Sequence, residues 1–243
     1  MNIKLLIIFL LFVLCISCGK IIDVFSKDLD TEYRTDVKSK FNHDNKILIE
    51  GKEYLYKVVQ KDKNRILNFD LILKTIPGNY SNGTKIKYKH YYNDEFLTEE
   101  EKSLYLDSIK FYKWDITSAH ENKEEFYIHP PRSYTLKKLE ITPFPQLKLP
   151  PIEGDYSYSV NNIIAGYGEY NMNRVYSEYH IKDIIYNVDS SFVVTINASS
   201  NWGKEKTDEK ICIANFEFDS KLGFTEMSYL FNDSTSIVFK MDK

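Results

Sequence analysis

The stretch Leu67-Asn68-Phe69-Asp70-Leu71-Ile72-Leu73 decides the fold. Its leucines and its phenylalanine recur at every second position, while Asn68 and Asp70 face the other way. This alternation is typical of a β-strand that buries one face and exposes the other to solvent. The segment therefore predicts a domain built from antiparallel strands.

The same period recurs along the chain on both sides of this stretch. Beyond the turn dipeptide Asn82-Gly83, four residues that suit a core alternate with three lysines that face solvent: Ile86, Tyr88, His90 and Tyr92 with Lys85, Lys87 and Lys89. Exposed lysines at this spacing are typical of an edge strand. Upstream, Ile47 to Glu50 and Tyr54 to Val59 form a predicted hairpin around Gly51.

The C-terminal half has the pattern of a meander. Strands are expected within Arg174–Ile185, Phe192–Ile196, Ile211–Phe218, Phe224–Phe231 and Ser236–Met241, and a polar loop over Asn197–Glu209. A capping-box pattern at Thr98–Glu101 predicts the start of a short helix. The fold class that follows is mainly β: an antiparallel sandwich or a partly open curved barrel, with at most one or two short helices.

Six of the seven prolines lie between residues 128 and 151. Proline lacks an amide donor and fixes φ, so no central strand can run through Pro143 to Pro151. Alternating apolar residues within the segment favour a rigid strap buried inside one domain, residues 46–243, and the alternative is a linker between two domains. We call residues 128–151 the proline strap.

The N-terminus has the features of a secretory signal. Lys4 precedes the apolar run Leu5 to Leu14, and Ser17-Cys18 follows. The apolar run is too short to span a bilayer as a helix. This pattern resembles the lipobox of bacterial lipoproteins, which implies cleavage of residues 1–17, lipidation of Cys18 and a tether over residues 18–45.

A second resemblance covers the last half of the chain. His129-Pro130-Pro131-Arg132, then Pro143-Phe144-Pro145, then Gly154-Asp155-Tyr156-Ser157-Tyr158, and finally Gly223-Phe224 with Tyr229, resemble a group of uncharacterised lipoproteins of Gram-negative bacteria. The resemblance implies attachment to the cell envelope, with the outer membrane expected and the leaflet left open, and it brings no activity with it.

Composition excludes several classes of function. The net charge is −3 at pH 7 and no stretch is basic, so a nucleic-acid partner is not expected. No catalytic, phosphate-binding or metal-binding motif occurs, and we expect no cofactor. Cys212 is the one cysteine beyond the predicted lipidation site, and its apolar neighbours predict a buried, inert thiol.

Two groups of residues are candidate sites. His120, Glu124 and His129, with Arg132 nearby, include ligand types that suit zinc. Charged loop residues surround them, however, so we expect a structural role without a metal, in which Arg132 reaches a carboxylate such as Glu140.

The second group is aromatic and comprises Trp202, Tyr167 and Tyr170. An aromatic ring with a polar edge suits a protein or glycan partner. The same tyrosines also have high strand propensity, so a purely structural role is the alternative.

These features together predict an exported protein, anchored to a membrane by an N-terminal lipid, with a non-enzymatic binding or structural role. One alternative is a hydrolase of envelope or dietary polymers, which needs a cleft with converging carboxylates or histidines. The other is a carrier of a hydrophobic ligand with an apolar cavity inside a curved sheet.

We predict that Cys18→Ala releases the protein from the membrane fraction. Each buried acyl methylene contributes ~0.8 kcal/mol to membrane binding, so a chain without its lipid lacks the anchor. Cell fractionation and intact-mass measurement check this. An unmodified mature N-terminus at another residue contradicts it.

Overall fold

The computed structural model describes residues 45–63, 65–80, 83–92, 114–132, 134–160, 174–203 and 208–242. All of them lie within the unit Lys40–Lys243. The predicted signal, Cys18, the tether up to residue 44 and the helix expected from Thr98 fall outside these ranges. Within them, no helix is long and apolar enough to cross a membrane.

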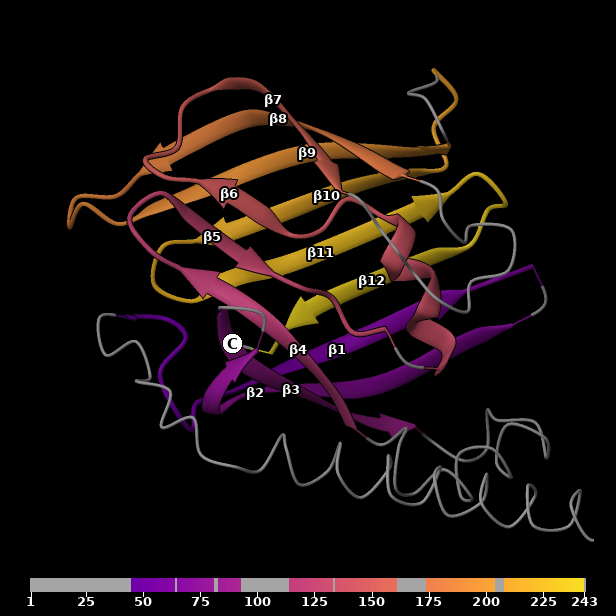
Figure 1. Ribbon diagram of the computed structural model, residues 1–243, viewed down its shortest axis with the longest axis horizontal. Helices are drawn as coiled ribbons and strands as arrows, with labels where there is room; N and C mark the ends of the chain where they lie inside the picture. Colours follow the sequence, from indigo (N-terminus) through magenta and orange to yellow (C-terminus); the bar gives the residue numbers. More distant parts are fainter. Residues whose placement is uncertain are drawn as a thin grey trace, which may run out of the picture. The chain divides into compact units, whose positions relative to one another are not determined.

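The described residues form one antiparallel sheet of twelve strands (Figure 1). The strands are β1 (Glu53–Lys61), β2 (Ile66–Tyr80), β3 (Gly83–Tyr92), β4 (Trp114–Glu121), β5 (Glu125–Ile128), β6 (Gln146–Lys148), β7 (Gly154–Val160), β8 (Arg174–Tyr186), β9 (Phe192–Gly203), β10 (Cys212–Asp219), β11 (Gly223–Phe231) and β12 (Ser236–Met241). A single 3₁₀-helix, η3 (Tyr134–Ile141), accompanies them in the described part of the chain. The predicted fold class, mainly antiparallel β, is confirmed.

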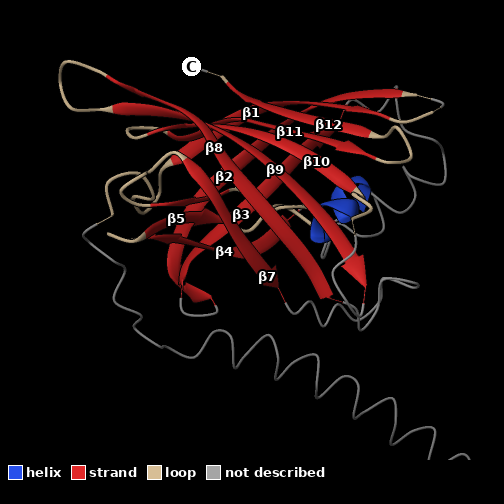
Figure 2. Cartoon of the chain, turned by 90° about the horizontal axis from the view of Figure 1, so that it is seen from above, coloured by secondary structure: helices blue, strands red, loops and turns tan. Residues whose placement is uncertain are grey.

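The sheet consists of two meanders that meet at β1 and β12. Its order is β6-β5-β4-β3-β2-β1-β12-β11-β10-β9-β8-β7, so the edges β6 and β7 are consecutive in the chain. The sheet curls so that β4, β5 and β6 pass in front of β10 and β11 (Figures 1 and 2). It does not close, but the Tyr156 hydroxyl of β7 donates a hydrogen bond to the Gln146 carbonyl of β6 at 2.8 Å.

A continuous row of buried apolar residues crosses the inner face of the sheet. Neighbouring strands place these side chains directly opposite one another, in the order Phe69, Val58, Phe239, Met227, Phe216, Ile196 and Ile181. Cross-strand apolar pairs are the unit of sheet stabilisation. The quoted stretch around Phe69 thus occupies a central strand, where its alternate residues are all buried.

The proline strap holds the 3₁₀-helix η3 followed by edge strand β6. Sequence reasoning expected an extended segment, but residues 134–141 contain no proline and have Leu136 and Leu139 three positions apart. Residues at i and i+3 lie on one side of a 3₁₀-helix, and both leucines are fully buried. Strand β6 agrees with the expectation that no central strand runs through Pro143 to Pro151, because it lies at an edge of the sheet between Pro145 and Pro150.

Three local predictions were wrong. Residues 46–48 form bends and Glu50 lies in a turn, so the expected strand over Ile47 to Glu50 is absent. The lysine-bearing strand β3 lies between β2 and β4 and is not an edge. The expected polar loop from Asn197 is instead the continuation of β9 to Gly203, because its residues pair with β8.

We predict that Phe144→Ala lowers the free energy of unfolding by about 3–5 kcal/mol. Phe144 in the proline strap is 7% exposed, its ring centroid lies 4.7 Å from that of His129, and its carbonyl accepts a hydrogen bond from the Tyr179 hydroxyl of β8. Because the strap contacts both meanders, the variant should still unfold in one cooperative transition, which urea unfolding measures.

The matched control is Ile152→Ala, at a side chain 75% exposed just beyond the strap. It should change the unfolding free energy by no more than about 0.5 kcal/mol. Two separate transitions, or rapid proteolysis between Pro143 and Pro151 into two stable fragments, would show that the strap is a linker.

Candidate functional site

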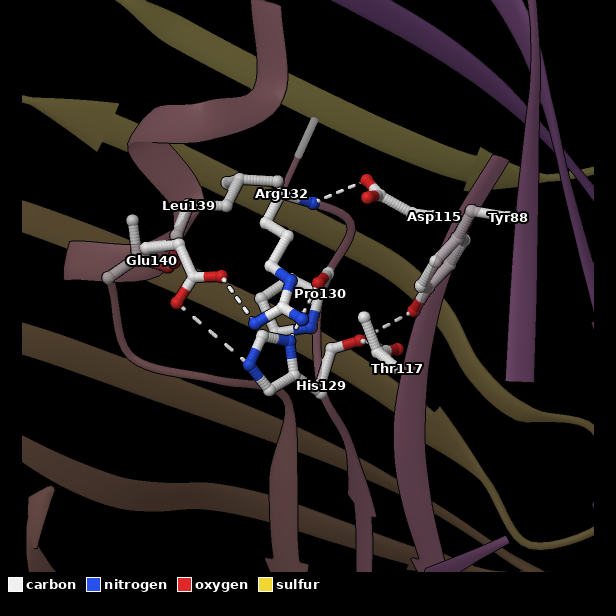
Figure 3. A network of polar contacts seen from close by, with 9 residues as sticks. Tyr88, Asp115, Thr117, His129, Pro130, Arg132, Leu139 and Glu140 are labelled. Atoms are coloured by element: carbon white, nitrogen blue, oxygen red, sulfur yellow. Dashed lines mark hydrogen bonds and ion pairs between the residues drawn. The ribbon is translucent and has the colours of Figure 1, made fainter. Parts of the chain in front are cut away.

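Two of the four predicted polar residues meet in a buried network with Glu140 and Asp115 (Figure 3). His129 and Arg132 follow β5, Glu140 lies on η3 and Asp115 on β4. Arg132 Nη1 lies 3.6 Å from Glu140 Oε1, the carboxylate that the sequence suggested, and the Arg132 backbone N–H donates to Asp115 Oδ2 at 2.7 Å. The network ties the proline strap to β4.

His129 is held in one orientation by backbone contacts. Its carbonyl accepts hydrogen bonds from the Tyr88 hydroxyl at 2.9 Å and from Thr117 Oγ1 at 3.2 Å. Its Nδ1 lies 2.8 Å from the Pro130 carbonyl, which can only accept, so the neutral ring carries its proton on Nδ1. Burial lowers the pKa of His129 to about 4, and this imidazole is therefore neutral near pH 7.

Glu140 is a buried carboxyl group beside two basic side chains. Burial is the main effect on this group and raises the pKa of Glu140 to about 7, although the charge of Arg132 acts to lower it. His129 Nε2 lies 3.9 Å from Glu140 Oε2. A carboxyl group with this pKa can exchange protons near neutrality, but the clefts found among the described residues are lined by other side chains. The arrangement supports a structural role.

His120 and Glu124 do not join this network. His120 is half-buried on β4, with its ring centroid 5.6 Å from that of Tyr127. Glu124 is exposed in the β4–β5 turn, where its carbonyl accepts the Leu149 N–H. Among the residues that the structure describes, no three His, Cys, Asp or Glu side chains are grouped to hold a metal ion.

Of the three aromatic residues predicted to form a surface, Trp202 is the one that lies in the described ranges. Trp202 lies in β9 opposite Val175 and packs, half-buried, against the core. Tyr167 and Tyr170 fall within residues 161–173, outside the description. Cys212 is buried in β10, and burial raises the pKa of its thiol to about 12, which is the inert state predicted from the sequence.

A cleft lined by both apolar and charged side chains lies where several strand ends meet. We call it the end cleft. Its volume is about 920 Å³, which is within the range of small-molecule sites. Five separate segments line it: residues 46–47, the β4–β5 turn with Phe126, residues 149–151, the start of β9 at Ser190 and Phe192, and the end of β10 at Phe218 and Ser220.

Three aromatic side chains, Phe126, Phe192 and Phe218, line the end cleft and form its apolar wall, and Tyr186 lies next to Phe192 outside the lining. The ring centroids of Tyr186 and Phe192 are 6.0 Å apart, those of Phe192 and Phe218 are 6.3 Å apart, and those of Phe218 and Phe126 are 5.0 Å apart. Tyr186 is 64% exposed, whereas Phe126 is fully buried. The row therefore leads from the surface into the core. The remaining interior is filled by large side chains, including Phe224, whose ring lies against Phe126 and Phe218.

Glu121 builds the opposite wall of the end cleft. Its carboxylate accepts the backbone N–H groups of Lys46, Ile47 and Leu48 at 2.7–3.1 Å. Successive N–H groups of a strand point to opposite sides, so three that converge on one carboxylate force the bends seen at 46–48. This contact explains why the strand expected there does not form.

A smaller cleft of about 550 Å³ lies on the outer face of β7, β8, β9 and β10. It holds two cross-strand ion pairs: Asp155 with His180 Nδ1 at 2.6 Å, and Glu178 with Lys210 at 2.5 Å. Acidic and imidazole groups are the residue types that a hydrolase needs. Here, however, the His180 and Asp155 side chains are 53% and 85% exposed, which is typical of surface pairs.

Sequence reasoning missed both clefts. The end cleft draws on residues more than 170 positions apart, and no motif joins them. Glu121 directly follows His120 of the candidate polar group, yet its carboxylate accepts backbone N–H groups 73–75 residues away.

We predict that Glu140→Gln stabilises the protein increasingly as pH rises from 4.5 to about 7. The folded state holds the Glu140 proton more tightly than the unfolded state, whose pKa is the ordinary 4.5, so wild-type stability from this group is lost across that window. Glutamine does not titrate. The difference in unfolding free energy should grow by up to about 3 kcal/mol, measured by urea unfolding at several pH values.

Burial lowers the pKa of His90, as of His129, to about 4, so both are neutral in the folded state over most of this window, and their titration in the unfolded state is common to both proteins. Glu124→Gln, in the exposed β4–β5 turn, is the control and should follow the wild type. If the curves of Glu140→Gln and wild type run parallel from pH 4.5 to 8, the buried carboxyl group does not have the raised pKa.

Comparison of the chain with protein-family models, with curated proteins and with solved structures gave no match. The lipoprotein resemblance of the sequence therefore stays an expectation.

Proposed function

We propose that this chain is an exported, lipid-anchored protein of the cell envelope with a non-enzymatic binding role, and that it binds an apolar ligand in the end cleft. The N-terminal pattern supports the export and anchoring. The observation that carries the binding role is the apolar lining of the end cleft, in which partly buried Phe192 leads to buried Phe218 and exposed Tyr186 continues the row of rings outside the cleft.

An apolar wall of this kind favours a ligand over a purely structural role. Monomeric soluble proteins rarely leave contiguous apolar surface exposed unless it contacts something. Apolar exposure continues beyond the cleft at Val188, which is fully exposed at the β8–β9 turn, and at Ile152, which follows Pro151 of the cleft lining. Exposed apolar side chains therefore occur close in sequence to two lining residues of the cleft, Ser190 and Pro151.

The proposal places the ligand at the end of the sheet, not inside it. A carrier of the expected type would hold its ligand in a hollow interior. In the described part of this chain, the space between the two halves of the sheet is occupied by Phe126, Phe216, Phe218 and Phe224. The ligand is therefore expected to lie against the ends of β9 and β10.

We predict that the neutral dye N-phenyl-1-naphthylamine binds the chain from residue 19 onward with enhanced fluorescence. This chain keeps every described residue and lacks only the predicted signal and Cys18. Phe192→Ser should weaken dye binding about five- to tenfold, because about 1–1.4 kcal/mol of ring contact is removed. Fluorescence titration measures the dissociation constants.

Leu230→Ser is the matched control, since Leu230 is 52% exposed on β11 and does not line the end cleft. It should bind the dye like the wild type. Absence of dye binding by the wild type, or equal loss in both variants, would contradict a binding role for the end cleft.

A further inference from the structure

We infer that the ligand of the end cleft is a single-chain amphiphile with an anionic headgroup, a carboxylate or a phosphate. This inference rests on the proposed function and adds the charge of the ligand to it. It comes from the polar groups at the rim, which are separate from the apolar wall.

The charged side chains that line the cleft differ in whether their charge already has a partner. Both oxygens of Glu121 accept backbone N–H groups, so its negative charge is already solvated by the protein. Lys46 and Lys123 line the same cleft, and neither has a carboxylate within ion-pair distance among the described residues. The rim therefore offers two ammonium groups whose charges no described acidic side chain neutralises.

The neutral polar groups at the rim also favour a negatively charged ligand. Asn122 Oδ1 accepts the N–H groups of Glu124 and Glu125, at 2.7 and 2.8 Å, which leaves the amide N–H₂ as the group available to a ligand. The Ser190 hydroxyl, in the β8–β9 turn, makes no hydrogen bond within the described ranges. Amide and ammonium donors gathered on one rim match an acceptor-only headgroup such as a carboxylate or phosphate.

The tail class follows from the apolar wall. The cleft that Lys46 and Lys123 line also has apolar lining from Ile47, Leu149 and Phe192. Phe192 is partly buried and leads to Phe218 and Phe126, which are nearly fully buried and pack against each other with ring centroids 5.0 Å apart. One acyl chain lying along this row satisfies both the polar rim and the apolar wall.

The experiment is displacement of N-phenyl-1-naphthylamine from the chain starting at residue 19. The competitors are dodecanoate, dodecyl phosphate and dodecyltrimethylammonium, each below its critical micelle concentration. At least one of the two anionic competitors should displace the dye at about tenfold lower concentration than the cation, and comparison of the two identifies a fatty-acid or a phosphate source. This preference should weaken as salt is raised, because rim charges are screened.

The variant is Lys46→Gln combined with Lys123→Gln. It should raise the half-displacing concentration of the preferred anion about tenfold, consistent with up to about 1 kcal/mol for each exposed ion pair, and leave dye affinity unchanged. The control is Lys61→Gln combined with Lys63→Gln at the far end of β1. Lys61 is seven residues, roughly 23 Å of strand, from Tyr54, whose hydroxyl donates to Ile47 of the cleft.

The outcomes separate the two proposals. If the dye binds but all three competitors displace it equally, or if both lysine pairs have the same effect, the anionic ligand is ruled out and the apolar binding role stands. If the dye does not bind the wild type, the proposed function itself fails. Anion preference that is lost only in the Lys46 and Lys123 variant supports the inference.

Discussion

The pairing of β1 with β12 is the constraint on which the rest of the structure depends. It joins residues about 180 positions apart, such as Lys57 and Lys240, and it is the sole link in the described sheet order between the two meanders. Ordering so long a loop is entropically unfavourable until many contacts form. The buried row through Val58 and Phe239 supplies those contacts, so this ladder and the core are expected to form together.

The end cleft is a consequence of how that sheet curls. With β1 and β12 at its centre, the outer strands of each meander turn toward each other, and Phe126 of β5 meets Phe218 of β10. Gly223, with a φ of +87°, allows the β10–β11 turn to approach Ile47 and Phe126, since a Cβ there would lie 3.3 Å from both side chains. Glu121 then fixes residues 46–48 across the opening.

The buried network around Glu140 has a different physical character from the cleft. It places a carboxyl group and an imidazole in a poorly solvated position beside the more exposed guanidinium of Arg132, and desolvation of the buried groups opposes the ion-pair attraction. What it gains is specificity of position, because backbone groups of Arg132 and His129 hold the proline strap against β3 and β4. The end cleft instead keeps its polar donors at the surface, available to a ligand.

The sequence alone determined the class of fold and the faces of most strands, since a period of two is a local property that any antiparallel sheet must satisfy. It also identified the proline strap and the contact between Arg132 and Glu140. Patterns were misleading where a distant group competed with a local preference. Residues 46–50 have strand-like composition, yet the carboxylate of Glu121 captures their N–H groups, and the lysines of β3 suggested an edge that pairing with β4 removes.

Strand order, the two edges and the end cleft were decided only by the tertiary structure. Which strand lies beside which depends on long-range pairing, and nothing in the residues of β1 specifies β12 as a neighbour. The cleft brings together side chains from five segments whose individual patterns are those of ordinary turns and strand ends. Its combination of an apolar wall with polar donors exists only after the sheet has curled, because curvature brings Phe126 of β5 against Phe218 of β10 in the cleft that Lys46 and Lys123 also line.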